Sequence, residues 1–194
     1  MFRHRFLTSD FVRAQLFDSA VAMNLKRTSL LLRRSLLLGL LLAGTSLADD
    51  AWVIREEGVG PVKIGMTLAQ LSATLHQKLS EEEGGSENCF YVNARDHDQV
   101  SFMIINGRLA RIDVDAPGVA TSAGIQVGDS EARARNAYGN RMKVTAHFYI
   151  DDGHYLTAQL ADGRYGVRFE TASGKIVRYY AGKYDAIQYV EGCE

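Results

Sequence analysis

The sequence predicts an α+β fold built from two similar units, each a helix packed on an antiparallel β-sheet meander. A capped helix pattern begins at Thr67, and a shorter one begins at Ser130. Each pattern is followed by β-rich runs separated by turns that end in glycine. Because a helix with one apolar stripe and a sheet with one apolar face must cover each other, each unit should place its helix on its sheet.

Residues 1–48 are typical of a signal peptide with an upstream extension. A basic segment precedes an apolar run at 36–43, and the small residues Ser46 and Ala48 stand at the third and first positions before the predicted cut. The apolar run is shorter than the roughly 18 residues that span a bilayer. Met23 is a better start for such a signal than Met1, which makes 23–48 the signal. The sequence therefore predicts a periplasmic or secreted chain starting at Asp49, with no stable membrane insertion and no lipid-anchor cysteine at the cut site.

Charge and cysteine content describe the exported part. Residues 49–194 carry 15 basic and 21 acidic side chains, which gives a net charge of −6. Such a balance argues against nucleic acid as a partner. Both cysteines, Cys89 and Cys193, lie in this part. An even count in an oxidising compartment predicts a disulfide between them.

The first unit is expected over residues 49–117. Residues 52–54 should form a short strand, and 62–64 should lead into the helix. Thr67 and Gln70 fit a capping box. Apolar side chains then fall at helical spacing on one face, and these are Leu68, Leu71, Leu75 and Leu79.

The sheet of the first unit follows a polar loop. Residues 89–92 should be a strand, 96–98 a polar turn, and 100–105 and 108–114 a hairpin around Asn106-Gly107.

The second unit is expected over residues 118–194, after a connector at 118–124. Ser130 is the predicted cap of its helix, and Gly139 is the predicted stop. Four strands are expected at 143–150, 154–160, 164–171 and 175–181, with a short edge strand at 184–190. Aligning Gly65 with Gly128 and Gly107 with Gly174 brings similar residues together, which indicates an internal repeat.

Alternation along these strands divides their side chains between two faces. One set should meet the helices, and it comprises Ala146, Phe148, Ile150, Leu156, Ala158, Leu160, Val167 and Phe169. The other set should lie on an open face, and its predicted binding residues are His147, Tyr149, Tyr155, Gln159, Arg164, Arg168, Arg178 and Tyr180, with Thr157 and Glu170 between them. Tyrosine and arginine are enriched at binding hot spots. They are also ordinary residues of a solvated strand face.

Two groups of side chains could form a metal site or a catalytic site, although ordinary surface roles also explain them. The side chains of 96–98 (Asp, His, Asp) could ligate a metal, but consecutive loop positions are weak support and no metal or cofactor is predicted. His147 and His154 flank a turn beside Asp151 and Asp152, and could approach one another. Polar strand ends explain them more simply, and no nucleophile-elbow pattern is present. The chain is therefore predicted not to be an enzyme.

The layout resembles a known architecture of exported proteins. The similarity rests on Ile64-Gly65-Met66-Thr67-Leu68 and, more weakly, on Val127-Gly128-Asp129-Ser130. A helix start of this kind, a following antiparallel sheet and a second copy resemble the secreted β-lactamase inhibitor protein and the SmpA/OmlA type of envelope module. The resemblance implies non-enzymatic binding of an envelope or extracellular protein, as by an inhibitor, through an open sheet face. A glycan or small ligand is the alternative.

Overall fold

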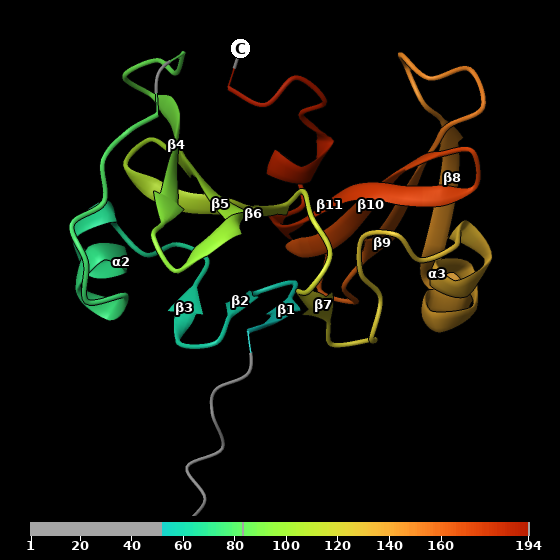
Figure 1. Cartoon of the computed structure of the whole chain (residues 1–194), viewed down its shortest axis with the longest axis horizontal. Helices are drawn as coiled ribbons and strands as arrows, with labels where there is room; N and C mark the ends of the chain where they lie inside the picture. The colour runs from blue at the N-terminus through green and yellow to red at the C-terminus, as the bar shows by residue number, and fades with distance from the viewer. Residues whose placement is uncertain (1–51, 83, 194) are drawn as a thin grey trace, which may run out of the picture. The chain divides into compact units, whose positions relative to one another are not determined.

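The computed structural model describes residues 52–82 and 84–193, and all of them lie in one compact unit, Ala48–Glu194. The predicted signal peptide and its cleavage site lie outside the described residues. The fold is mixed, with two α-helices and extensive antiparallel sheet among the described residues. The two predicted regions, 49–117 and 118–194, share a continuous sheet (Figure 1).

A seven-stranded antiparallel sheet forms the centre of the fold. Its strand order is β4-β5-β6-β11-β10-β9-β8. Strands β6 and β11 pair side by side, with Asp113 opposite Tyr180, and so join the two halves. The strands are β4 (Cys89–Ala94), β5 (His97–Ile105), β6 (Arg108–Val114), β8 (Met142–Ala146), β9 (His154–Gln159), β10 (Tyr165–Ala172) and β11 (Lys175–Lys183).

A smaller sheet lies beneath the large one. It has the order β3-β2-β1-β7, and β1 pairs with β7 in parallel. This pairing ties the beginning of the described chain to the segment that leads into the second half. The strands are β1 (Val53–Arg55), β2 (Gly58–Val59), β3 (Val62–Lys63) and β7 (Ala120–Thr121).

Both predicted helix caps are confirmed. In α2 (Leu68–Thr74), the Thr67 hydroxyl accepts from the Gln70 N–H, and the Gln70 side chain accepts from the Thr67 N–H. In α3 (Glu131–Tyr138), the Ser130 hydroxyl accepts from Arg133 N–H. Gly139 ends α3 with φ of 57° and ψ of −136°, a positive-φ conformation that glycine adopts readily. A 3-10 turn, η1 (Gly139–Arg141), leads into β8.

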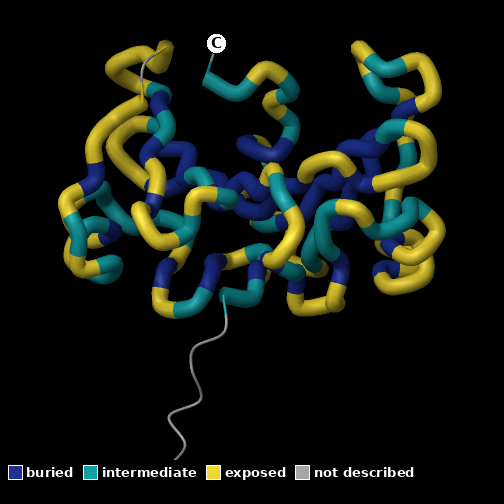
Figure 2. Tube along the Cα trace, viewed as in Figure 1, coloured by how far each residue is buried: buried dark blue, intermediate teal, exposed yellow. Residues whose placement is uncertain are grey.

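The helices and the small sheet cover one face of the large sheet (Figure 1). On this face, the Tyr138 ring of α3 packs edge-on against Phe169, with ring centroids 5.5 Å apart. The Tyr179 hydroxyl donates to the Val119 carbonyl oxygen. Buried residues run along the middle of the large sheet (Figure 2). The hydrophobic core therefore lies between this face and the elements beneath it.

The same backbone junction occurs in both halves. The Gly65 N–H donates to the Leu109 carbonyl oxygen at 2.7 Å, and the Gly128 N–H donates to that of Ile176 at 2.8 Å. Each acceptor follows a tight turn whose two central residues have positive φ. These turns are Asn106-Gly107 and Ser173-Gly174. The junctions fix each helix start against the hairpin of its own half.

Several predicted boundaries are wrong. Helix α2 ends at Thr74, so Leu79 is buried in the following loop instead of the helix. The turn expected at 96–98 falls at 95–96, and His97 begins β5. Strand β8 ends at Ala146, and the expected edge strand at 184–190 contains the 3-10 helix η2 (Ala186–Gln188).

None of the helices in the described ranges combines the length and apolarity needed to cross a membrane.

Candidate functional site

The face of the large sheet opposite the helices carries the last residues of the chain. We call 184–193 the tail and this side of the sheet the tail-bearing face (Figure 1). Ala186 and Ile187 of η2 are buried against it. Gly166 permits their approach, because an added Cβ there would lie 2.9 Å from Ile187 Cδ1. The predicted disulfide between Cys89 and Cys193 is present, and it fixes the end of the tail to β4.

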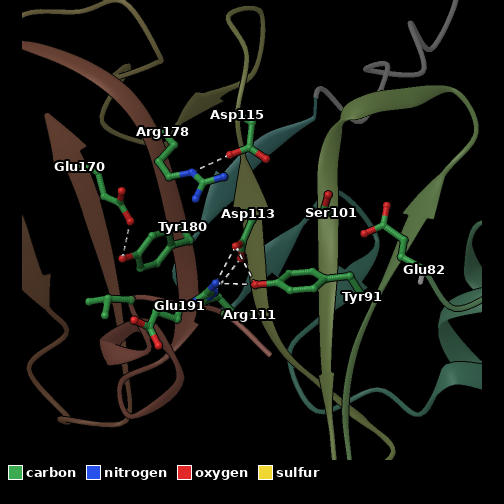
Figure 3. A pocket seen from close by; sticks show the side chains of 12 residues that line it. Glu82, Tyr91, Ser101, Arg111, Asp113, Asp115, Glu170, Arg178, Tyr180 and Glu191 are labelled. Atoms are coloured by element: carbon green, nitrogen blue, oxygen red, sulfur yellow. Dashed lines mark hydrogen bonds and ion pairs between the residues drawn. The ribbon is translucent and has the colours of Figure 1, made fainter. Parts of the chain in front are cut away.

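Arg111 connects the tail to the sheet (Figure 3). Its Nε and Nη2 donate to the two carboxylate oxygens of Asp113, both at 2.7 Å. Its Nη1 donates to the carbonyl oxygens of Ala186 and Tyr189, and Nη2 also donates to the Tyr91 hydroxyl at 2.6 Å. These contacts use all five N–H donors of the guanidinium. Arg111 is therefore a structural anchor, fully occupied within the molecule.

Electrostatics keep this guanidinium charged. Burial alone would lower the pKa of Arg111, but the negative charge and hydrogen bonds of Asp113 outweigh burial, and its pKa is raised. The side chains of Arg111 and Asp113 are only 4% and 10% exposed. The Arg111 guanidinium also lies 4.3 Å from the centre of the Tyr180 ring. A buried charge with so many partners holds one geometry.

A pocket of about 340 Å³ opens beside this anchor. Tyr91 and Ser101 stand on one side of it and Tyr180 on the other (Figure 3). Five carboxylates and two guanidiniums line it, and each bonds to another side chain. The charged lining residues are Glu82, Arg111, Asp113, Asp115, Glu170, Arg178 and Glu191. The pocket is acidic: Asp113 and Asp115 form ion pairs with Arg111 and Arg178, and the other three carboxylates are hydrogen-bonded to side chains of the protein.

A second polar cluster lies under η2. Arg168 Nε donates to the Thr157 hydroxyl at 2.9 Å, and its Nη2 donates to Gln188 of η2. Glu170 accepts from the Tyr180 hydroxyl at 3.0 Å and contacts His147 Nε2 at 3.2 Å. Arg168 therefore holds η2 against the sheet. These side chains were expected to be open to solvent, but they bond to one another and to the tail.

The predicted binding residues divide into two groups. They do share the tail-bearing face, but Tyr155, Arg168 and Tyr180 are buried there, together with Thr157 and Glu170. The expectation of an open face is wrong at these positions, because η2 bonds to Arg168, Arg111 lies over Tyr180, and His147 and Phe148 pack against Tyr155. The more accessible members are Tyr149, Gln159, Arg164 and Arg178, and Tyr149 is 65% exposed, whereas the side chain of His147 is only 5% exposed.

The loop 147–153 is the feature that the sequence analysis missed. Phe148 was assigned to the set that faces the helices, yet its side chain is 75% exposed. Phe148 lies outside β8, so strand alternation does not apply to it. The only signal in the sequence is the turn at Asp151-Asp152-Gly153, and it does not show where the preceding strand ends.

The chemical alternatives find no support in the geometry. His147 stacks on Tyr155 on the tail-bearing face, whereas His154 contacts Glu131 of α3 on the other face. The two imidazoles therefore do not meet. His97 stacks on Trp52, and burial lowers its pKa against the opposing charge of Asp96. Within 52–82 and 84–193, no cluster of His, Cys, Asp or Glu is suited to hold a metal ion.

Comparison with known proteins yields structural neighbours alone. No protein-family model and no curated protein matches this chain. The uncharacterized protein yfeY from Escherichia coli aligns at 12% identity and a TM-score of 0.43, over 68% of this chain and 99% of its own. A DUF4309 family protein, YjgB from Bacillus subtilis, aligns at 13% identity and a TM-score of 0.41, over 67% of this chain and 86% of its own.

Proposed function

We propose that this chain is an exported, non-enzymatic binding module that engages a protein partner at the edge of the tail-bearing face. The observation that carries the proposal is the exposed aromatic pair Phe148 and Tyr149, whose side chains are 75% and 65% exposed. Adjacent exposed aromatic rings are the kind of anchor that protein interfaces bury at their centre.

The aromatic pair is held in place before any partner arrives. The Tyr149 hydroxyl donates to Glu191 of the tail, and the Tyr149 N–H donates to His147 Nδ1 at 3.1 Å. The Phe148 ring lies 5.8 Å from that of Tyr155. Because these contacts already fix the loop, binding requires less ordering of its side chains.

The disulfide supports export. A bond between Cys89 and Cys193 persists in the periplasm or outside the cell, where thiols are oxidised. This agrees with the compartment indicated by the signal-like segment, and it supports a partner among envelope or extracellular proteins. The proposed resemblance to secreted inhibitors and envelope modules fits the same setting.

We also propose that the fold is a tandem repeat of one helix-and-sheet unit. Gly107 and Gly174 are 67 positions apart, and so are Asp113 and Tyr180, which face each other between β6 and β11. Adding 67 to the residue numbers of β6 therefore gives residues of β11. The matched junctions at Gly65 and Gly128 also support a repeat, at a spacing of 63 positions instead of 67. If the fold consists of two such copies, the tail is an addition that follows the second copy and makes the two sides of the large sheet different.

Site-specific photo-crosslinking tests the binding proposal. A photoreactive benzoylphenylalanine replaces Phe148 in the mature, oxidised protein, and in a control it replaces Val177, which is 39% exposed on β11. After irradiation in envelope extract, we expect a discrete protein adduct from position 148 that excess unlabelled protein suppresses, and none from position 177.

The same experiment can overturn the proposal. An adduct of equal yield at both positions would indicate nonspecific collision, and no protein adduct at position 148 would contradict a protein partner at this loop. An adduct with glycan alone would favour the glycan alternative. The variant Phe148→Ser should lose the partner while its thermal unfolding midpoint stays unchanged, since an exposed ring contributes little to folding.

A further inference from the structure

Strand β8 is an exposed edge of the large sheet. It pairs with β9 on one side, and within the described residues no strand or bridge pairs with its other side. The opposite edge differs, because residues near Glu81 and Glu82 bridge to β4, with the Glu82 N–H donating to the Tyr91 carbonyl oxygen. The edge at β8 therefore presents backbone groups that an added strand can bond.

The identity of those backbone groups follows from one hydrogen bond. The His147 N–H donates to the Gly153 carbonyl oxygen at 2.9 Å, in register with the β8–β9 ladder. Consecutive residues of an antiparallel strand alternate between facing the partner and facing away. The backbone N–H and C=O groups of Lys143 and Thr145 therefore point toward β9. The outward backbone groups belong to Val144, Ala146 and the Met142 carbonyl, since the Met142 N–H already donates to the Gly139 carbonyl oxygen.

The side chains along this edge are basic. From Gly139 to Tyr149 the chain carries Arg141 and Lys143 and no carboxylate, although residues 49–194 as a whole have a net charge of −6. Both basic residues are exposed. A lysine on an edge strand discourages pairing with apolar strands. It leaves pairing open to a strand whose side chains are acidic.

We infer that β8 accepts an extended, acidic segment of the protein partner as an additional antiparallel or parallel strand. Main-chain hydrogen bonds to Val144, Ala146 and the Met142 carbonyl would hold the segment, and Arg141 and Lys143 would select its charge. Phe148 follows β8 directly and offers an apolar contact at the end of the added strand. The inference rests on the proposed function and specifies its mode of recognition.

Amide hydrogen exchange measured by NMR tests the inference on the mature, oxidised protein. The probe is a blocked heptapeptide of alternating valine and glutamate at millimolar concentration, and the matched probe replaces glutamate with lysine. We expect the glutamate peptide to slow exchange at 144 and 146 and to leave 143 and 145 unchanged, and the Met142 N–H, which already donates to Gly139, should not change either. The lysine peptide should have no such effect. The alternating pattern is specific to strand addition, since a side-chain contact would not follow backbone parity.

A charge-reversal pair controls for electrostatics. Lys143→Glu should weaken binding of the glutamate peptide by about three- to tenfold, whereas Lys175→Glu, an equally large charge change at an exposed site on β11, should leave it unchanged. Equal protection by both peptides, or uniform protection along β8, would overturn the inference. So would protection that grows with protein concentration in the absence of peptide, because a second copy would then be the occupant.

These outcomes separate the two proposals. Crosslinking at Phe148 without alternating protection along β8 would leave the binding module in place and remove strand addition as its mode. Alternating protection by the acidic peptide without any crosslinked protein at Phe148 would support the edge as a peptide site and contradict the anchor loop.

Discussion

Arg111 shows how much one buried side chain can organise. Removing its guanidinium would leave Asp113 buried without its counter-charge and two tail carbonyls without their donors. We therefore expect Arg111→Ala to lower the free energy of unfolding by about 3–5 kcal/mol, as measured by urea denaturation.

Arg178 provides the matched control. It lies on β11, and it pairs with Asp115 at 2.8 Å with both side chains 47% exposed. An exposed ion pair contributes about 0–1 kcal/mol, so Arg178→Ala should be nearly neutral. If both variants lose the same free energy, Arg111 is not the anchor that its contacts indicate.

The sequence predicted which side chains share a face of the sheet, but it did not predict which of them are exposed to solvent. Alternation assigned Tyr155, Arg168 and Tyr180 to one face, and the structure confirms that they share it. Alternation could not show that η2 folds back over this face of the sheet, because that contact joins positions far apart in the chain. The apolar pair Ala186 and Ile187 was the available signal, and it was read as part of an edge strand.

The tail has two attachments of different kinds. Ala186 and Ile187 are buried, and Arg111 holds the carbonyl oxygens of Ala186 and Tyr189. The disulfide holds the far end. In Cys193→Ser, we expect amide exchange to become fast after Tyr189, while residues 186–188 keep their protection in NMR exchange measurements. Loss of protection throughout the tail would mean that the disulfide alone keeps it in place.

Hairpins were the most predictable elements, and short pairings were the least. Asn106-Gly107 carries the residue types that a tight turn requires, and it forms as predicted, with Asn106 at φ 51°. Strand β7 has two residues and pairs in parallel with β1, so residues 120–121 looked like a connector. Neither local propensity nor alternation can identify a partner so distant and so brief.

Buried tyrosines should make the folded protein sensitive to alkali. Burial raises the pKa of five tyrosines, and it raises that of Tyr138 to about 12. The five are Tyr91, Tyr138, Tyr155, Tyr179 and Tyr180. Because the unfolded chain loses these protons near pH 10, it binds fewer protons than the folded state above that pH. The free energy of unfolding should therefore fall as pH rises from about 10 to about 12.

Two measurements check the alkaline prediction. Urea midpoints should decrease between pH 9 and pH 11, and tyrosinate absorbance at pH 11 should increase when the protein is unfolded in guanidinium. Equal absorbance from the folded and unfolded chains would contradict the burial of these hydroxyls. Tyr138 and Tyr179 lie on the helix-bearing face of the large sheet, and Tyr91, Tyr155 and Tyr180 lie on the tail-bearing face, so the measurement reports on both faces.

The disulfide also decides how the molecule responds to mechanical force. Cys89 and Cys193 are separated by 104 positions, and the closed loop contains all seven strands of the large sheet. Tension between the two ends of the chain would pass across the sulfur bridge and bypass that loop. In an optical trap, the reduced protein should extend by about 350 Å more than the oxidised protein, at about 3.4 Å per residue. The oxidised sheet would experience almost none of the load.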